Sequence, residues 1–366
     1  SLGPDGLHPR ILFEVRNEIA KGLNIIFNYS LQNHQVPQDW RTGSISPIFR
    51  KGIKTEASNY RPISLTSILC KLLESLIKDH IVHFFIANNL FSIKQYGFIK
   101  GRSTVLQLLK IIDDWTMMLE DGGQIDVIYT DFEKAFDRVP HKRLISKLYS
   151  YNINEDIIKW IKAYLDNRKQ RVKINSCYSN WASVLSGVPQ GSILGPLLFI
   201  IYINELPDIC NSGSNLFLYA DDAKLYKHIL NSQDKDVLQN DLIKLKLWAD
   251  NWLINLNIVK CKKVSYGRLI DNTFHYNLNN IDLDNIESIK DLGVIFDSHL
   301  KFKLHISDKV NKAYSILGII RRNFTFLDKD SFIVLYKSMV TSHLEYANCI
   351  WSPYTVQDIK SLEKVQ

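Results

Sequence analysis

Residues 217–226 read FLYADDAKLY, and this short segment decides the fold. Two adjacent carboxylates, Asp221 and Asp222, lie between apolar flanks that alternate as β-strands do. Successive strand residues point to opposite faces, so only a tight turn lets both carboxylates approach one point. Because two such carboxylates repel each other, a bound divalent cation is the simplest partner for them, although an Asp-Asp pair alone is typical of a solvated turn. The segment therefore predicts a β-hairpin with a candidate metal site at its turn.

A third carboxylate, Asp131, ends a second predicted strand. Residues 124–131 alternate polar and apolar side chains and indicate a strand in the core. Two strands that each deliver a carboxylate favour a two-metal site, in which ions about 3.5–4 Å apart activate the attacking oxygen and stabilise the leaving one. The alternative is that each Asp merely caps its own strand.

The composition is that of an ordinary globular protein with a basic excess. The chain has 366 residues, of which 46% are hydrophobic, and this argues against disorder. Lys and Arg total 45 and Asp and Glu total 38, which gives a net charge of +7. The excess suits a polyanionic partner, but many basic proteins without one share it. At this length we expect two or three subdomains that share a core.

The cysteines and the apolar runs exclude several classes of protein. Five cysteines lie far apart in an odd number and without a Cys-x-x-Cys pair, a pattern that indicates a reduced, intracellular protein. The most apolar run, residues 193–203, is shorter than the roughly 20 residues of a membrane span, so we expect no membrane partner. The chain begins with Ser1 and has no signal-peptide pattern, and we expect it to be part of a longer protein at both ends.

Basic residues and glycines mark candidate nucleic-acid contacts. Lys51 and Arg61 are candidate phosphate ligands, because Arg grips phosphate bidentately and Lys acts as a point charge. The loop 95–104 is rich in Gly and basic residues and brings backbone and cations close to a phosphate chain, unless it is a plain helix-entry turn. Residues 168–174 form a basic alternating strand that runs along a backbone or is a solvated edge. The Gly- and Pro-rich loop 186–192 suits a flat base or a nucleotide, or is a tight turn.

Periodicity also predicts the remaining helices and strands. Helices are expected over residues 9–33, 67–85, 104–119, 142–167 with a break near Asn152, 192–206, 233–255, 306–322 and 331–351. We further expect a strand pair over 40–52, a strand after Lys260, a loose hairpin over 271–290 and a strand over 289–296.

An ordered series of short motifs resembles the reverse transcriptases of non-LTR (LINE-like) retrotransposons, especially the jockey and chicken-repeat-one branches. The series is GPDG (3–6), YRPIS (60–64), QYGF (95–98), GRST (101–104), DF (131–132), KAFD (134–137), GVPQGS (187–192), LGP (194–196), YADD (219–222), KCK (260–262), LGV (292–294) and HLEYA (343–347) with Trp351. The motifs cover essentially the whole chain, and their order makes the series specific.

The resemblance implies an α+β fold, a right-hand polymerase with an antiparallel-sheet palm, mixed fingers and a helical thumb. We expect fingers with an N-terminal extension over residues 1–120, the palm over 121–300, and over 301–366 a thumb that is truncated.

The resemblance also implies the catalytic centre. Asp131, Asp221 and Asp222 would hold two Mg²⁺ ions, with Mn²⁺ as the alternative, and the main-chain carbonyl of Phe132 would complete one shell. Lys260 resembles the general acid that protonates the departing pyrophosphate.

Substrate contacts are implied in the same way. Lys51 and Arg61 would grip the triphosphate, and Phe136 would clash with a 2′-hydroxyl and so favour deoxynucleotides. Gln190 and Gly191 would line the nucleotide and template pocket. A primer grip is implied at Leu292, Gly293 and Val294, and a template contact at Gly101, Arg102 and Ser103, where Ile99 replaces the basic residue of many relatives.

The function implied is RNA-directed DNA synthesis of a non-LTR retrotransposon. Its partners would be an RNA template, a DNA primer and dNTPs, and it would act inside the cell, in the nucleus at the site of integration. An endonuclease domain is expected in the full-length protein and is absent from this segment. The alternatives are a catalytically silent nucleic-acid-binding relic and a splicing-assisting intron-type protein, and the intact catalytic residues disfavour the relic.

Overall fold

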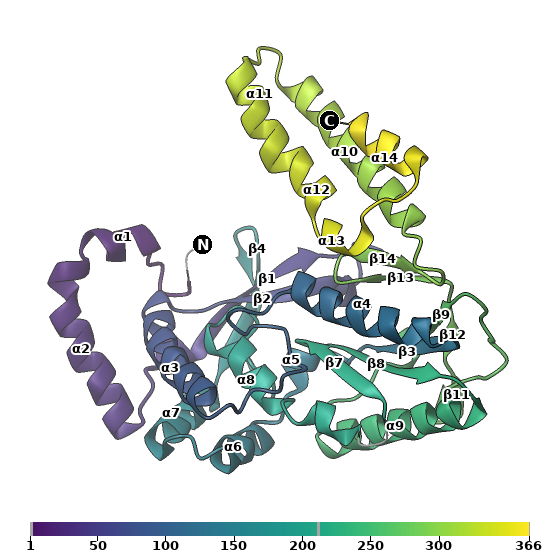
Figure 1. Cartoon of the computed structure of the whole chain (residues 1–366). Helices are drawn as coiled ribbons and strands as arrows, with labels where there is room; N and C mark the ends of the chain where they lie inside the picture. The colour runs from purple at the N-terminus through teal and green to yellow at the C-terminus, as the bar shows by residue number, and fades with distance from the viewer. Residues whose placement is uncertain (1–2, 211–212, 366) are drawn as a thin grey trace. The chain divides into compact units, whose positions relative to one another are not determined.

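The computed structural model describes residues 3–210 and 213–365, which form two compact units whose elements are labelled in Figure 1. The first unit takes residues up to 98 together with 132–209 and 244–257, and the second takes 99–131, 210–243 and the chain from 258 onward. Each unit is assembled from separate stretches of sequence, and the boundaries expected at residues 120 and 300 stay predictions. Within the described ranges, the helices are all too short or too polar to cross a membrane.

The first unit combines helices with one mixed sheet. Its elements are α1 (Pro9–Glu14), α2 (Arg16–Asn33), β1 (Thr42–Phe49), β2 (Tyr60–Leu65), α3 (Ile68–Ala87), α5 (Ala135–Arg138), α6 (His141–Ser150), α7 (Glu155–Leu165), β4 (Lys169–Ile174), β5 (Cys177–Tyr178), β6 (Ala182–Ser183) and α8 (Leu194–Tyr202).

Its sheet runs β2-β1-β4-β5, and β6 also pairs with β4. Strand β1 is antiparallel to β2 and parallel to β4. The strand pair expected over residues 40–52 is wrong, because β1 is a single strand whose partner lies beyond the turn at 51–59. The basic strand β4 is not a solvated edge, since it has a partner on each side.

Helix α8 anchors the core of this unit. All of its residues except Pro196 are buried, and its N-terminus meets the Glu74 side chain of α3. Glu74 Oε2 accepts hydrogen bonds from the amides of Ile193 and Leu194, at 2.8 and 3.0 Å. A carboxylate is favoured at a helix N-terminus, where free amides and the helix dipole are positive. This contact ties the end of the 186–192 loop to α3.

The second unit is built on an antiparallel sheet. Its elements are α4 (Thr104–Glu120), β3 (Gln124–Thr130), β7 (Asn215–Tyr219), β8 (Asp222–Ile229), β9 (Lys262–Gly267), β10 (Asn277–Leu278), β11 (Ile281–Asp282), β12 (Asp284–Asn285), β13 (Ser288–Asp291), β14 (Val294–Asp297), α10 (Lys303–Asn323), α11 (Lys329–Leu335), α12 (Ser342–Glu345), α13 (Asn348–Trp351) and α14 (Val356–Glu363). Helix α9 (Ser232–Asn251) continues from this unit into the first.

The sheet order is β12-β9-β3-β8-β7, so β3 is the central strand. It pairs antiparallel with both β8 and β9, which confirms the core strand expected over residues 124–131. On one face, Trp115 of α4 packs against Tyr226 and Tyr266, with ring centroids 5.8 and 4.6 Å apart. Large fully buried rings of this kind supply much of the energy that fixes a helix on a sheet.

Leu292 and Gly293 of the motif at 292–294 form a turn, and Val294 begins β14. Strands β13 and β14 pair as a hairpin, joined by Leu292 and Gly293 with φ of 44° and 93°. The strand expected over 289–296 is therefore wrong, because both turn residues need the left-handed backbone that glycine adopts most readily. A Cβ on Gly293 would also lie 2.9 Å from the Tyr346 ring.

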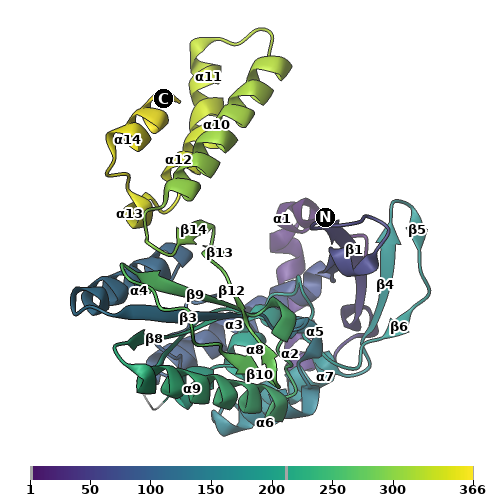
Figure 2. The same ribbon diagram turned by 90° about the vertical axis from the view of Figure 1, so that its right-hand side faces the viewer.

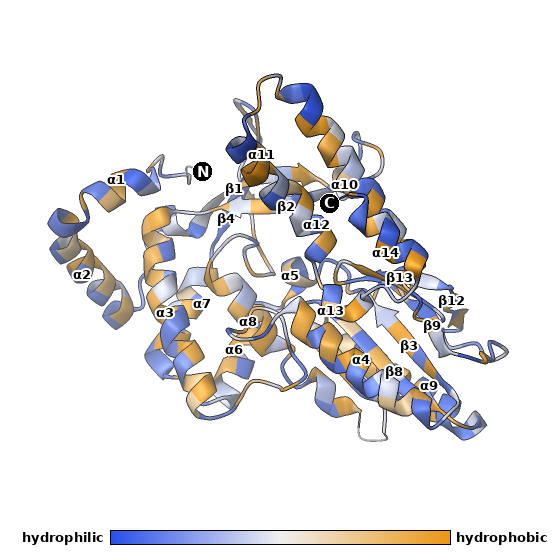
Figure 3. Ribbon diagram, turned by 45° about the horizontal axis from the view of Figure 1, so that its top comes forward, coloured by the Kyte–Doolittle hydropathy of each residue, from blue (hydrophilic) through white to orange (hydrophobic). Residues whose placement is uncertain are grey.

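The C-terminal helices pack around α10. Buried Ala313, Ile316 and Ile320 of α10 contact Val340 and Leu344, and Figure 3 shows polar and apolar residues alternating along α10. The single helix expected over residues 331–351 is wrong: the backbone passes from α11 through a π-helical segment, Tyr336–Thr341, into α12 and then α13.

Candidate active site

The acidic hairpin predicted at residues 217–226 is confirmed. Strand β7 ends at Tyr219 and β8 begins at Asp222, and these two residues pair across the turn. Ala220 adopts φ of 55°, the left-handed conformation that a two-residue turn requires. From α4, Gln107 Nε2 donates to the carbonyl of Leu218 at 3.0 Å and fixes the end of β7. The turn is thus held by the pairing of β7 with β8 and by the Gln107 side chain.

Asp131 reaches the same place from the neighbouring strand. Thr130 is the last residue of β3 and pairs with Ala223 of β8, and its Oγ1 also donates to the Ala223 carbonyl at 3.1 Å. Asp131 follows directly, beside Asp222. Lys260 approaches with its Nζ 3.3 Å from Asp131 Oδ2. The structure therefore brings together Asp131, the Asp221–Asp222 turn and Lys260 within one unit.

Negative charge is concentrated at this point. Desolvation by the surrounding protein, together with the charges of Asp221, Asp291 and Asp131, raises the pKa of Asp222 to about 6, although its side chain keeps contact with solvent. Lys224 opposes the shift without cancelling it. A raised carboxyl pKa of this origin reports a shortage of positive charge, which a cation would supply.

Asp291 is a member of this cluster that sequence reasoning missed. Its Oδ2 accepts a hydrogen bond of 2.5 Å from Lys224 Nζ, and both side chains are buried, with 6% and 1% of their surface exposed. The pair ties the β13–β14 hairpin to β8, so the motif at 292–294 is attached to the acidic turn. The sequence signal was an acid placed directly before Leu292-Gly293-Val294.

The donor set fits a magnesium site. Carboxylate oxygens are the ligands Mg²⁺ prefers, and this ion keeps several waters or substrate phosphates in its shell rather than a full protein cage. In the described part of the chain, no group of three or more His, Cys, Asp or Glu side chains lies close enough together to hold a metal ion. A pair of carboxylates that leaves room for a phosphate matches what such a site requires.

The aromatic residue predicted to contact the sugar lies in the first unit. Phe136 stacks on Phe199 of α8 with centroids 4.4 Å apart at 22°, and it meets Phe98 edge-on at 6.3 Å. Contacts on two sides leave the ring little freedom to move. Nearby, Phe132 is buried and forms a backbone bridge with Leu256.

Gln190 is held by its neighbours on both its side chain and its backbone. Its Nε2 donates to Asp137 Oδ1 at 2.9 Å, and its carbonyl accepts from the Ser64 amide at 2.6 Å. Gly191 adopts φ of 117°, and a Cβ there would lie 2.5 Å from the Ser64 carbonyl, so glycine is required. Asp137, which the sequence reasoning gave no role, orients the Gln190 amide because the carboxylate accepts from its nitrogen.

A cavity of about 390 Å³ in the first unit is bordered by Gln190 and Asp137, with Lys134 at its rim. Residues of β1, β2, β4 and β6 and the segment 184–189 contribute to the rest of its wall. Its size and mixed polar lining suit a nucleotide base.

The other predicted contacts lie on exposed loops and turns. Arg61 of β2 pairs with Ile48, and Lys51 follows the end of β1, so both cations belong to one end of the β1–β2 pair. In the second unit, Gly101 has φ of 83°, and Ser103 caps α4 by accepting from the Leu106 amide at 3.2 Å. Lys51 and Arg61 belong to the first unit, and Gly101 and Ser103 belong to the second.

An antiparallel sheet that presents acids at a β-hairpin turn, with a basic side chain beside them, is the arrangement that the motifs predicted for a polymerase palm. The chain belongs to the family described as reverse transcriptase (RNA-dependent DNA polymerase), whose model matches residues 51–319. Members of this family generally use divalent metal ions. The non-LTR resemblance seen in the motifs is confirmed by the relatives that follow.

Curated relatives are mobile-element polymerases. The chain is 29% identical to the "Probable RNA-directed DNA polymerase from transposon X-element" of Drosophila melanogaster, over 94% of this chain and 39% of that protein. It is 30% identical to its counterpart from transposon BS of the same species, over 82% and 34%. It is 29% identical to the RNA-directed DNA polymerase from mobile element jockey of Drosophila funebris, over 94% and 39%. The chain thus spans less than two fifths of the length of these relatives.

A solved structure supports the fold. An apo telomerase from Candida tropicalis, truncated from its C-terminal domain, aligns with a TM-score of 0.52 at 13% identity, over 78% of this chain and 59% of that one. At this identity the match concerns the fold alone, and it confirms the expected α+β right-hand polymerase class.

Proposed function

We propose that this chain catalyses RNA-directed DNA synthesis for a non-LTR retrotransposon, adding dNTPs to the 3′-hydroxyl of a DNA primer on an RNA template. The observation that carries the proposal is the convergence of Asp131, the Asp221–Asp222 turn and Lys260 in a chain of the reverse transcriptase family. We extend the proposal, on the family resemblance, to action in the nucleus at the integration site beside an endonuclease domain.

Asp131, Asp221 and Asp222 would hold two Mg²⁺ ions, with Mn²⁺ as the alternative and the Phe132 carbonyl as a further ligand. When bound, such ions lower the pKa of an attacking hydroxyl and stabilise charge on the leaving phosphate. The chain's own residues provide the rest: Lys260 would donate a proton to the departing pyrophosphate, a general-acid role. Its position beside Asp131, with 65% of its side chain exposed, leaves the ammonium accessible to substrate.

Selection of the nucleotide would fall to residues of the first unit. The Phe136 ring, fixed by Phe199 and Phe98, would exclude a 2′-hydroxyl. Gln190 and Gly191 would border the base, and Lys51 and Arg61 would bind the triphosphate. Leu292-Gly293-Val294 would contact the primer end, and Gly101-Arg102-Ser103 the template, in each case through backbone contacts that read no sequence.

The test is primer extension on an RNA template with Mg²⁺ and dNTPs, comparing the parent chain with Asp221→Asn. Extension by the parent and its loss in the variant are expected. Absence of extension by both, with template–primer binding intact, would contradict the proposal and favour a silent binding module.

A further inference from the structure

Strands β4, β5 and β6 form a ribbon (Figure 2). One face of this ribbon carries cations and aromatic rings. Lys169, Arg171 and Lys173 alternate along β4 and so share a face, and Tyr178 lies opposite Lys173 in the register. The guanidinium of Arg171 lies over the rings of Tyr178 and Trp181, at 4.0 and 4.5 Å from their centroids. The ribbon therefore carries a basic–aromatic face made of these five residues.

This face is open to solvent and its charge is not neutralised. Tyr178 and Trp181 keep 48% and 43% of their surface exposed. Residues 168–185 contain four basic side chains, Arg168 among them, and no acidic one. Within the residues that the structure describes, none of Lys169, Arg171 and Lys173 forms an ion pair with an acid. Among the described residues, these three side chains therefore form a positive surface that is not ion-paired.

A purely structural role explains only part of this face. Arg171 stabilises the ribbon by cation–π contact with both rings, and Lys173 Nζ lies 5.5 Å from the Tyr178 centroid. These contacts do not explain why Tyr178 and Trp181 both remain exposed. Cations alternating with exposed rings are what single-stranded nucleic acid recognises, because bases stack on the rings while phosphates meet the cations.

The opposite face of β4 adds a second observation. Gln170 and Val172 point to the other side of the strand and border the cavity that Gln190 and Asp137 also border, and Lys169 borders this cavity as well. The strand that carries the basic–aromatic face therefore also forms a wall of the proposed nucleotide cavity.

We propose that the basic–aromatic face binds the unpaired RNA template, with bases stacked on Tyr178 and Trp181 and phosphates beside Lys169 and Lys173. This inference rests on the proposed function for the identity of the strand. A duplex is disfavoured as the ligand, because paired bases are stacked on one another and offer no free ring faces along the helix.

The first experiment compares binding of two template–primer hybrids, one blunt and one with about ten unpaired template nucleotides, a length within the usual site size. The double variant Tyr178→Ala with Trp181→Ala should bind the overhang hybrid about tenfold more weakly and the blunt hybrid as the parent does. The matched control is Tyr149→Ala on α6, whose side chain is 46% exposed, and it should leave both affinities unchanged. Equal binding of the overhang by parent and double variant, or equal loss with both hybrids, would overturn the inference.

A second variant keeps the ribbon's rings intact. Lys173→Gln should lower the slope of log affinity against log salt by about 0.7 for the overhang hybrid, the value for one phosphate contact on a single strand. Lys142→Gln, an exposed lysine of α6, should leave the slope unchanged. An unchanged slope for Lys173→Gln would contradict the phosphate contact.

Primer extension on a template with a very short overhang separates this inference from the proposed function. If the parent extends the primer there and the ribbon variants bind long overhangs normally, the inference fails and the function stands. If the parent extends nothing, the proposed function fails.

Discussion

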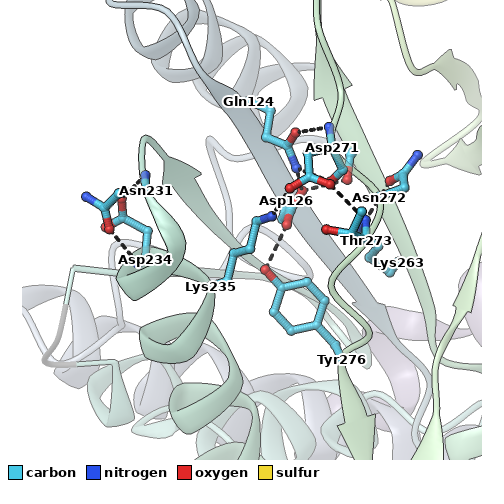
Figure 4. Close-up of polar contacts among 11 residues, drawn as sticks. Gln124, Asp126, Asn231, Asp234, Lys235, Lys263, Asp271, Asn272, Thr273 and Tyr276 are labelled. Carbon is cyan, nitrogen blue, oxygen red and sulfur yellow. Dashed lines mark hydrogen bonds and ion pairs between the residues drawn. The ribbon is translucent and has the colours of Figure 1, made fainter.

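Two aspartates, one within β3 and one directly after it, have opposite surroundings. Asp126 of β3 is fully buried, and its oxygens accept hydrogen bonds from Gln124, Ser265 and Tyr276 at 2.7, 2.6 and 2.7 Å (Figure 4). Asp131, five residues further along, is partly exposed and has Lys260 at 3.3 Å. The strand and the residue after it therefore carry one carboxylate whose acceptors are occupied and one that is open to solvent.

The same network continues outward from Asp126. The carboxylate of Asp271 pairs with Lys235 of α9 at 2.5 Å, and Lys263 Nζ donates to Asn272 at 2.9 Å (Figure 4). The Gln124 side chain exchanges two hydrogen bonds with the Asp271 backbone, at 3.1 and 2.7 Å. These contacts attach the segment after β9 to the sheet, so Asp126 has a structural part to play.

This difference shows how an acidic residue with a structural role can be distinguished from one with a functional role. A buried carboxylate with donors on both oxygens is stable as it stands and needs no further partner. Carboxylates crowded by like charges, as Asp222 is by Asp221, Asp291 and Asp131, gain from a partner that is not part of the chain. On this account function belongs to the acids at the β7–β8 turn and stability to Asp126.

The largest effect is expected for Asp222→Asn. Removing a metal ligand should slow primer extension by about 10³-fold or more, since bound ions contribute several kcal/mol to the transition state. Because one of several crowded negative charges disappears, the free energy of unfolding should stay the same or rise. Single-turnover extension and denaturant unfolding measure the two quantities, and a large loss of stability would break the comparison.

Asp126→Asn should do the reverse. The amide cannot accept from all three donors, so unfolding should become easier by about 3 kcal/mol while the folded fraction keeps its extension rate. Urea unfolding of the variant and the parent gives the value. Asp282→Asn, on the exposed end of β11, is the control and should shift stability by less than about 0.5 kcal/mol. An Asp126 variant that folds normally but does not extend primers would place this acid in catalysis.

Lys260 sharpens the functional side of the comparison. Lys260→Met should slow extension about 10²-fold, the usual worth of a general acid, and leave stability close to that of the parent because the side chain is 65% exposed. Lys262→Met, two residues along and paired with Asp284, serves as the control and should extend at the parental rate. Equal rates for Lys260→Met and the parent would remove Lys260 from the mechanism.

A buried histidine, His305, extends the comparison from acidic to basic side chains. His305 of α10 is fully buried, accepts from the Ile295 amide at 3.1 Å, and burial followed by the nearby Lys309 lowers its pKa to about 4. The facing charges are Lys309 and Asp308 on its own helix and Lys290 on β13, while the Trp351 ring covers one side.

Between pH 6.5 and about 4, the His305 imidazole is therefore protonated in the unfolded chain and neutral in the folded chain. Stability should be complete above pH 6.5 and fall by roughly 3 kcal/mol as the pH drops through this window. Unfolding measured across the window, in the parent and in His305→Gln, reports the effect. A variant whose stability keeps the same slope would show that His305 is not its source.

Local patterns sufficed where the chemistry is local. The acidic hairpin was predictable because the alternation around Asp221 and Asp222 and the turn between them all lie within ten residues. The Asp126 network was not, since its partners Ser265 and Tyr276 are 139 and 150 residues away in the sequence. No short window contains the donors that make this acid a structural one.

The hairpin at Leu292-Gly293 shows a different reason for a wrong prediction. Residues 289–296 are apolar enough for a strand, and the pattern gave no weight to the positive φ that Gly293 adopts. The close approach of Tyr346, 54 residues from Leu292 and bonded to its carbonyl at 2.7 Å, is tertiary information. Likewise the edge alternative for β4 was wrong, because its parallel pairing with β1 joins segments far apart in the sequence.

The most direct test of the division between the two acidic groups is a Mn²⁺ titration followed by electron paramagnetic resonance, with template–primer and dNTP present. The parent and Asp126→Asn should bind the ion equally, and Asp222→Asn should lose most of the binding. Equal binding by Asp222→Asn and the parent, or loss of binding in Asp126→Asn alone, would contradict the account.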